Sequence, residues 1–263
     1  MSRMQHTPAL LASHLKTLRL PTMLRECEAV ARQAGESDAT YELFLQQLAE
    51  AEVQQRQAAS IERRLKQASF PTAKELSEFD FTAAPKVNKK RLLELARCRF
   101  IEQRSNVVFT GAPGTGKTHL AIALGREACR RGCKVRFFTA SGLANIYIEA
   151  REERQLLRLE KQIQRSDLII VDELGYIPLD RNGAEHLFGF FSQCYEQTSL
   201  IVTTNLPFAD WPQIFANDER MTGALLDRLT HHVHIVEVPG DSYRLKTSLK
   251  RSRRKGGEPA ATA

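Results

Sequence analysis

The stretch Gly111-Ala112-Pro113-Gly114-Thr115-Gly116-Lys117-Thr118 decides the fold of this chain of 263 residues. It matches the pattern G-x-x-x-x-G-K-[ST], in which glycines let a loop bend so that backbone N–H groups converge on phosphate oxygens. An apolar run, residues 106–110, precedes the stretch, and a helical pattern, residues 119–130, follows it. Because phosphate-binding loops join a strand to the N-terminus of a helix, the stretch predicts a nucleotide-binding α/β protein.

The chemistry of a bound triphosphate assigns roles within this loop. Lys117 is predicted to reach the β- and γ-phosphates of ATP, and the Thr118 hydroxyl is predicted to bind Mg²⁺. His119 begins the following helix, and we expect it to pack beside the nucleotide rather than to act in catalysis. The predicted nucleotide contacts are Gly111, Ala112, Pro113, Gly114, Thr115, Gly116, Lys117, Thr118 and His119.

A second element is the apolar run 168–171, which ends in Asp172 and Glu173. A carboxylate at the end of a buried strand organises Mg²⁺, so Asp172 joins Thr118 as a predicted metal ligand. Glu173 is placed to polarise a water molecule that attacks the γ-phosphate. A P-loop kinase would not need this second carboxylate, so the pair favours hydrolysis of ATP.

A third element is the apolar run 199–204, which is followed by Asn205. An amide at this strand end can hold the attacking water against the γ-phosphate. Asparagine at a strand end is also common turn chemistry, so the signal depends on its order after Asp172 and Glu173.

Short apolar runs alternate with helical patterns through the second half of the chain. This alternation is typical of a parallel sheet that is buried on both faces. The predicted fold class is therefore α/β, with a five-stranded parallel sheet whose strands are residues 106–110, 134–139, 167–172, 199–204 and 232–238.

The chain is predicted to have three parts. Residues 1–75 form a helical N-terminal domain that binds a partner or DNA, because apolar residues recur there at helical spacing and the long helix 40–67 has a polar middle. Residues 76–244 form the ATPase domain, which opens with a helix over residues 88–102. Residues 245–263 form a basic C-terminal tail.

Composition limits the function classes. The net charge is +7, and residues 244–255 alone carry seven basic residues and no acidic ones. This stretch and the basic segment 86–99 favour contact with a polyanion such as double-stranded DNA, although a solvated tail has the same composition. The five scattered cysteines indicate reduced thiols and a cytoplasmic location. No apolar run approaches the ~20 residues that span a membrane.

Several phrases resemble the DnaC/IstB group of AAA+ ATPases, and within it the IstB-like helpers of insertion-sequence transposition. They include residues 106–111, 116–125, 172–176, 225–229 and 241–244. The resemblance implies an ATPase that assembles on DNA and recruits or activates a cognate transposase. It also implies roles for three residues: Asn205 as first sensor, Arg228 as arginine finger and Arg244 as second sensor. Arg220 competes with Arg228 for the finger role.

The chain beyond the last predicted strand is too short for the full C-terminal lid of a generic AAA+ protein. A neighbouring subunit is therefore expected to close the site, which predicts a homo-oligomer with nucleotide between subunits. Two alternatives share the ATPase core. One is a replicative helicase loader of the DnaC type, and the other is an ATP-dependent DNA-architectural scaffold with little turnover.

Overall fold

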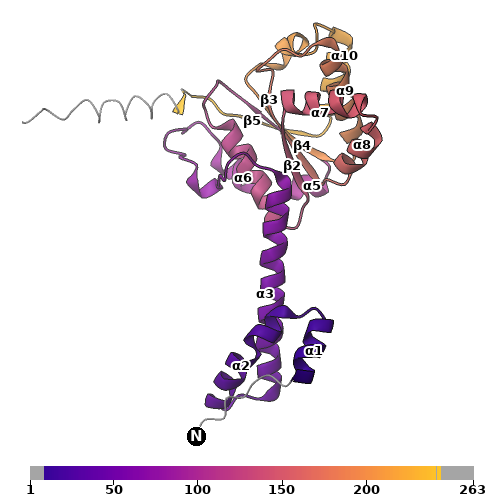
Figure 1. Cartoon of the computed structure of the whole chain (residues 1–263). Helices are drawn as coiled ribbons and strands as arrows, with labels where there is room; N and C mark the ends of the chain where they lie inside the picture. The colour runs from indigo at the N-terminus through magenta and orange to yellow at the C-terminus, as the bar shows by residue number, and fades with distance from the viewer. Residues whose placement is uncertain (1–8, 241, 244–263) are drawn as a thin grey trace, which may run out of the picture. The chain divides into compact units, whose positions relative to one another are not determined.

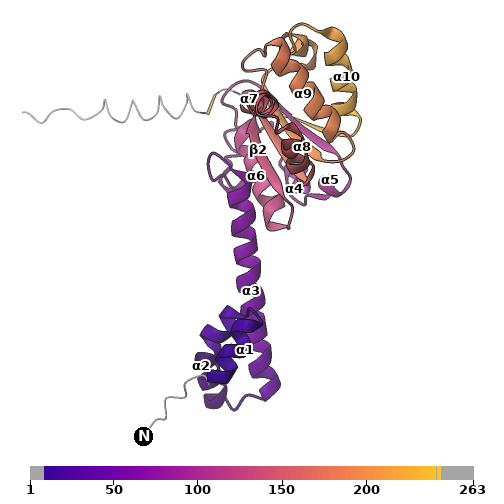
Figure 2. The ribbon, with the colours of Figure 1, turned by 45° about the vertical axis from the view of Figure 1, so that its right-hand side comes forward.

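The computed structural model describes residues 9–240, 242 and 243, and the chain divides into two compact units, Met1–Arg63 and Arg64–Ala263. The described part of the N-terminal unit is helical, as predicted, and its helices appear in indigo and purple in Figures 1 and 2. They are α1 (Ala9–Thr17), α2 (Pro21–Glu36) and the first part of α3 (Tyr41–Ala68).

A buried carboxylate joins the helices of this unit. Glu52 of α3 is 4% exposed and accepts hydrogen bonds from the amides of Thr22 (2.8 Å) and Met23 (3.0 Å) at the start of α2. Arg56, one turn further along α3, pairs with Glu52 at 2.8 Å and donates to the Arg19 carbonyl beyond α1. Glu52 thus supplies acceptors to helix amides that have no partner within their own helix.

The units meet at Arg63, within α3, rather than at the predicted boundary after residue 75. Residues between these points pack in the second unit. Ala68 is fully buried in its core, the Phe70 ring contacts the helix after the phosphate loop, and Glu75 forms ion pairs with that helix. The predicted tail, residues 245–263, lies outside the described residues.

The second unit is built on a five-stranded sheet in the order β2-β3-β4-β1-β5, and every strand pair is parallel. This confirms the predicted fold class; β1 and β4 have the predicted bounds, and the ends of the other three strands differ from the prediction by one or two residues. The strands are β1 (Asn106–Thr110), β2 (Val135–Thr139), β3 (Leu168–Leu174), β4 (Ser199–Thr204) and β5 (Val233–Glu237).

Helices cover both faces of the sheet, as Figure 1 shows. Each face of the sheet has its own hydrophobic core, because successive side chains of a strand point to opposite faces. Ile170 lies in the core with α6 (Lys117–Arg130), while Ile169 lies in the core on the opposite face. Because both faces are buried, the strands read as continuous apolar runs. The helices of the opposite face are α7 (Ala140–Glu152), α8 (Leu156–Gln164), α9 (Arg181–Cys194) and α10 (Glu219–Thr230).

The helix predicted over residues 88–102 is broken in two, α4 (Lys89–Leu95) and α5 (Arg99–Glu102). The break is at Cys98, whose φ of +61° is left-handed and incompatible with a continuous helix. Cys98 is buried at this turn, as are Leu95 at the end of α4 and Phe100 and Ile101 within α5. Two short 3₁₀ segments complete the fold, η1 (Leu76–Glu78) and η2 (Phe208–Gln213).

Within the described ranges, no helix has both the length and the apolar character needed to cross a membrane.

Candidate nucleotide-binding site

The phosphate loop lies between β1 and α6, at the carboxyl end of the sheet. Gly111, Gly114 and Gly116 have φ values of +146°, +78° and +103°, which residues with side chains rarely adopt. A Cβ at each of these glycines would also overlap an atom of another segment. The three overlapping residues, which we call the loop collar, are Val238 at Gly111, Ser242 at Gly114 and Phe79 at Gly116.

Lys117 begins α6 and is buried, with only 9% of its surface exposed. Its Nζ donates hydrogen bonds to the carbonyls of Gly111 (2.7 Å) and Ala112 (2.8 Å), while the Thr115 hydroxyl donates to Ala112 at 3.0 Å. The ammonium group therefore lies within the curve of its own loop, where loop amides and a lysine together bind phosphate.

Asp172 is the centre of a hydroxyl network at the end of β3. It is 3% exposed, and its Oδ1 accepts hydrogen bonds from Thr118 (2.9 Å) and Thr203 (2.5 Å). The structure thus brings together Thr118 and Asp172, which are 54 residues apart in the chain. Thr203 was not predicted, because nothing in the run 199–204 distinguishes it from any other buried strand residue.

Glu173 follows Asp172 in an unusual backbone conformation. Its φ is +60°, and the register of β3 against β4 shifts between Val171 and Leu174. Its amide donates to Thr203 Oγ1 at 2.9 Å, so one threonine is hydrogen-bonded to both members of the acidic pair, Asp172 and Glu173. The bulge leaves Glu173 exposed while Asp172 stays buried. A left-handed non-glycine residue costs about 1–2 kcal/mol, which the surrounding hydrogen bonds must offset.

The donor atoms around Asp172 fit a magnesium ion. Mg²⁺ in nucleotide sites is held by one or two carboxylates, a hydroxyl and the phosphates of the substrate. The Asp172 carboxylate and the Thr118 hydroxyl are oxygen ligands of these types, and they lie 2.9 Å apart. They are the residues that would hold the ion.

Asn205 lies one residue beyond β4, which pairs with both β1 and β3. Its half-buried side chain therefore belongs to the sheet edge that carries the phosphate loop and Asp172. This is the position that the predicted water-holding role requires.

Of the arginines predicted from the family resemblance, Arg228 and Arg220 lie on α10 and Arg244 lies outside the described residues. Arg228, on α10, stacks over the Phe188 ring at 5.4 Å and donates to the Ala224 carbonyl at 2.8 Å. Arg220 is exposed in the first turn of the same helix. Arg244 lies outside the described residues.

His119 faces the segment before the ATPase core. Its Nε2 hydrogen-bonds the Glu75 carbonyl at 2.8 Å, which requires the proton on that nitrogen, and its ring packs edge-on against Phe79 at 5.4 Å. The sequence could not predict the contact between His119 and Glu75, because the two residues are 44 positions apart in the chain.

Comparison with known proteins agrees with this geometry. The model of the family described as "IstB-like ATP binding protein" matches residues 13–251. The chain belongs to this family. Two IstB-like relatives are named as ATP-binding proteins of insertion sequences. That of IS5376 from Geobacillus stearothermophilus is 40% identical, over 87% of this chain and 91% of its own length. That of IS21 from Pseudomonas aeruginosa is 38% identical, over 90% and 89%.

Solved structures share the fold of this IstB-like chain. AMPPCP-bound DnaA from Aquifex aeolicus matches with a TM-score of 0.55 and 18% identity, covering 73% of this chain and 58% of its own. DnaI matches with a TM-score of 0.51 and 15% identity, covering 64% and 89%. At these identities the likeness concerns the fold alone. The predicted family and the AAA+ fold are thereby confirmed.

Proposed function

We propose that this IstB-like protein hydrolyses ATP and acts as a DNA-binding helper, which assembles on DNA and recruits or activates a transposase. The observation that carries the hydrolytic part is the pairing of a buried carboxylate with an exposed one at a single strand end. Asp172 is fixed by two hydroxyls, and Glu173 is turned outward by the bulge. Binding of nucleotide alone would not need the second group.

In the proposed reaction, Lys117 and the loop amides bind the β- and γ-phosphates, and Glu173 accepts the proton of the attacking water. Asn205 orients that water from the neighbouring strand. Thr118 and Asp172 would hold Mg²⁺, which would supply positive charge to offset the charge of the phosphates. Thr203 holds Asp172 and the Glu173 amide in fixed positions, so that little rearrangement is needed during the reaction.

Oligomerisation would complete the site with Arg228 from a neighbouring subunit. On α10 the Arg228 guanidinium lies on the Phe188 ring and makes no ion pair with a described acidic residue. An arginine finger needs a guanidinium that is not neutralised within its own subunit. The absence of such an ion pair among the described residues supports the role of arginine finger for Arg228. The alternative was an ion pair on the helix surface with its neighbour Asp227.

Contact with duplex DNA is supported by basic side chains before the sheet. Those of residues 86–99 are all exposed, although the break at Cys98 means that they do not lie along the single helix predicted over residues 88–102. Such side chains would bind phosphates rather than bases, so binding should weaken steeply with salt. The basic C-terminal residues would add to this binding.

The N-terminal unit is proposed to bind the transposase or a partner subunit. Leu10, Leu18 and Leu45 are 69%, 65% and 58% exposed, and its own helices do not cover them. Exposed apolar side chains in such numbers favour a contact with another macromolecule. Names of the relatives as insertion-sequence proteins support a transposase as that partner.

Phosphate release, measured with and without duplex DNA, tests the hydrolytic proposal. Glu173→Gln should lower the rate by about 10²-fold or more, because it removes the proton acceptor and keeps its size. Glu185→Gln is the matched control, since Glu185 is an exposed glutamate whose ion pair among the described residues is with Arg181. An unchanged rate in Glu173→Gln would instead favour the scaffold that binds ATP without using its turnover.

Co-purification tests the partner. Full-length protein with ATP and DNA should retain the transposase encoded by the same insertion sequence. Recovery of a replicative helicase and no transposase would favour the helicase loader.

A further inference from the structure

A segment before the sheet runs along the helix that carries the nucleotide-binding lysine. We call residues 70–81 the α6 strap. Phe70 contacts α6 near Gly125, where an added Cβ would come within 3.0 Å of its ring, and Phe79 contacts the other end at Gly116. Glu75 contacts α6 at His119, through its carbonyl oxygen, and at Arg126 and Arg130, through its carboxylate. The strap therefore touches α6 at its start, middle and later turns.

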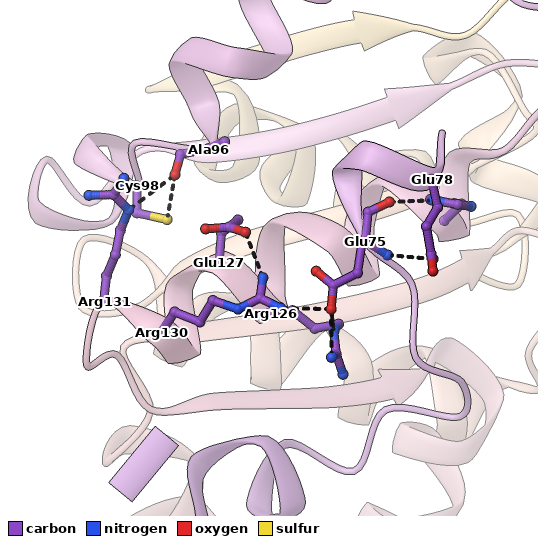
Figure 3. Close-up of polar contacts among 9 residues, drawn as sticks. Glu75, Glu78, Ala96, Cys98, Arg126, Glu127, Arg130 and Arg131 are labelled. Carbon is purple, nitrogen blue, oxygen red and sulfur yellow. Dashed lines mark hydrogen bonds and ion pairs between the residues drawn. The ribbon is translucent and has the colours of Figure 1, made fainter. Parts of the chain in front are cut away.

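Glu75 makes more polar contacts than any other residue drawn in Figure 3. Its Oε1 accepts from Arg126 (Nη2 at 2.6 Å, Nε at 2.8 Å) and from Arg130 (Nη2 at 2.7 Å). Its carbonyl oxygen binds the His119 ring at 2.8 Å. Because Arg126 and His119 both lie on α6, one strap residue holds two turns of the helix.

The strap is itself rigid around Glu75. The Glu78 carboxylate accepts from the Glu75 amide at 3.0 Å, in a capping box that closes η1. Hydrogen bonds from the two arginines, Arg130 before Arg126, outweigh burial and lower the pKa of the Glu75 carboxyl. The carboxylate is therefore charged at neutral pH, and its bonds to both guanidinium groups are charge-assisted.

Phe79 connects the strap to the phosphate loop through contacts of its ring. Its ring lies edge-on to His119 at 5.4 Å, and its Cε2 would be 2.7 Å from a Cβ on Gly116. Gly116 is the residue before Lys117, so the ring limits movement of the loop just where α6 begins. Displacement of binding groups by even 1 Å can cost a large factor in rate.

We propose that Glu75 is a positioning residue for the nucleotide site. By clamping the strap to Arg126 and Arg130, it seats Phe79 on the loop and fixes the start of α6, which carries Lys117 and Thr118. The inference concerns nucleotide binding by this chain, and its catalytic consequence rests on the proposed ATPase function. Glu75 itself touches neither the phosphate loop nor the Asp172 network in the contacts described.

Glu75→Gln in the full-length protein tests the clamp, because it keeps the size of the side chain and removes its charge. Glu127→Gln is the matched control. Glu127 also pairs with Arg130, at 2.6 Å, but it lies on α6 and forms no hydrogen bond or ion pair with residues 70–81. Affinity for ADP, kcat, KM and hydrogen exchange of the strap amides are measured for both variants and the wild type.

We expect Glu75→Gln to weaken ADP binding about fivefold, to lower kcat about tenfold and to speed exchange of amides 75–81. Glu127→Gln should stay within about twofold of the wild type in each measurement. A purely structural loss would lower the active fraction, and with it the apparent kcat, without changing the ADP dissociation constant. Equal effects of the two substitutions, or unchanged ADP affinity in Glu75→Gln, would overturn the proposal.

Phe79→Leu is a second route to the same test if Glu75→Gln does not fold. It leaves the ion pairs intact and removes the ring from Gly116, so ADP affinity should fall in the same direction. Unchanged affinity in this variant would also overturn the proposal. If wild-type protein bound ADP and released no phosphate, the proposed ATPase function would fail, while ADP affinity and hydrogen exchange would still decide the role of Glu75.

Discussion

Two regions of the molecule differ in how fully their side chains are buried and bonded. One is the edge of the sheet that carries the phosphate loop, and the other is the set of helices in the N-terminal unit. At the sheet edge, strand residues such as Phe109 and Ile169 are fully buried, and Asp172 has two hydroxyl partners. In the N-terminal unit, Leu10 and Leu45 are 69% and 58% exposed. A site that binds a small ligand needs its groups fixed in advance, whereas a surface that binds a macromolecule can leave apolar side chains for the partner to cover.

One device is nevertheless common to both regions. Each uses a single buried carboxylate to join segments that are far apart in the chain: Asp172 joins α6 to β4, and Glu52 joins α3 to the start of α2. The consequences of losing them should differ, because Asp172 belongs to the proposed reaction site, whereas Glu52 holds helices of the N-terminal unit together.

The largest effect is expected from Lys117→Ala. Removing the ammonium group from the phosphate loop should lower the rate of ATP hydrolysis by about 10³-fold, since an interaction aimed at developing charge is lost. The thermal unfolding temperature of the variant separates this loss from a loss of folding, because the Lys117 ammonium group also bonds to the Gly111 and Ala112 carbonyls. Phosphate release and circular dichroism together check this. A rate within tenfold of the wild type would contradict the assigned role.

Glu52→Ala should have the next largest effect, and it should be confined to the N-terminal unit. Two helix amides and Arg56 would lose their acceptor, at a cost of about 2–3 kcal/mol. Hydrogen exchange should become faster in residues 20–60, while ATP hydrolysis without DNA stays unchanged. Glu50→Ala is the control, because Glu50 is exposed and its side chain accepts a hydrogen bond from Gln46 on the same helix. Equal exchange in both variants would show that Glu52 does not hold the unit.

The same carboxylate predicts a pH dependence. Burial raises the pKa of Glu52, but hydrogen bonds from the Met23 amide, Arg56 and the Thr22 amide outweigh it and leave the pKa below its usual value of 4.5. A carboxyl whose pKa is lowered by folding contributes its full stability above the unfolded pKa and loses it as the pH falls through the folded pKa. Stability of the N-terminal unit should therefore fall below about pH 4.5 in the wild type, and less in Glu52→Gln.

A smaller effect is expected from Thr203→Val, which keeps the shape of the side chain and removes its hydroxyl. Asp172 and the Glu173 amide would each lose one hydrogen bond, so hydrolysis should fall about tenfold. Thr222→Val is the control: Thr222 is equally buried, but its hydroxyl bonds to the Asp218 carbonyl on α10. Single-turnover phosphate release would separate the two variants. Identical rates would remove Thr203 from the site.

The smallest effect is expected from Leu45→Ser. Because this side chain is 58% exposed, the free energy of unfolding should change by less than about 0.5 kcal/mol. Leu120→Ala, in the fully buried core, should cost about 2–5 kcal/mol. Denaturant titration measures both. A large loss in Leu45→Ser would mean that the N-terminal helices depend on this residue for their own fold.

Local patterns were enough to predict the elements that bind phosphate. The loop, the strands and Asp172 follow from residues adjacent in the chain, because a strand buried on both faces and a glycine-rich turn each have a local signature. Other features depend on residues that are distant in the chain. The role of Thr203 depends on a contact across 31 positions and that of Glu75 on a contact across 44 positions. The bulge at Glu173 depends on the register of β3 against β4. The break at Cys98 was missed because the helical periodicity of residues 88–102 continues across it.

The loop collar has a consequence for the order in which genes that encode IstB-like chains accumulate substitutions. Gly111, Gly114 and Gly116 are proposed to be required by phosphate, and Val238, Ser242 and Phe79 also leave no room for a methyl group at these positions. A smaller residue in place of Lys117 or Thr118 would lose hydrogen bonds but would cause no such overlap. In copies of the gene that no longer need ATP but still encode a folded chain, the three glycines should persist after the lysine and threonine have drifted. A glycine pattern without its lysine would then mark a former ATPase.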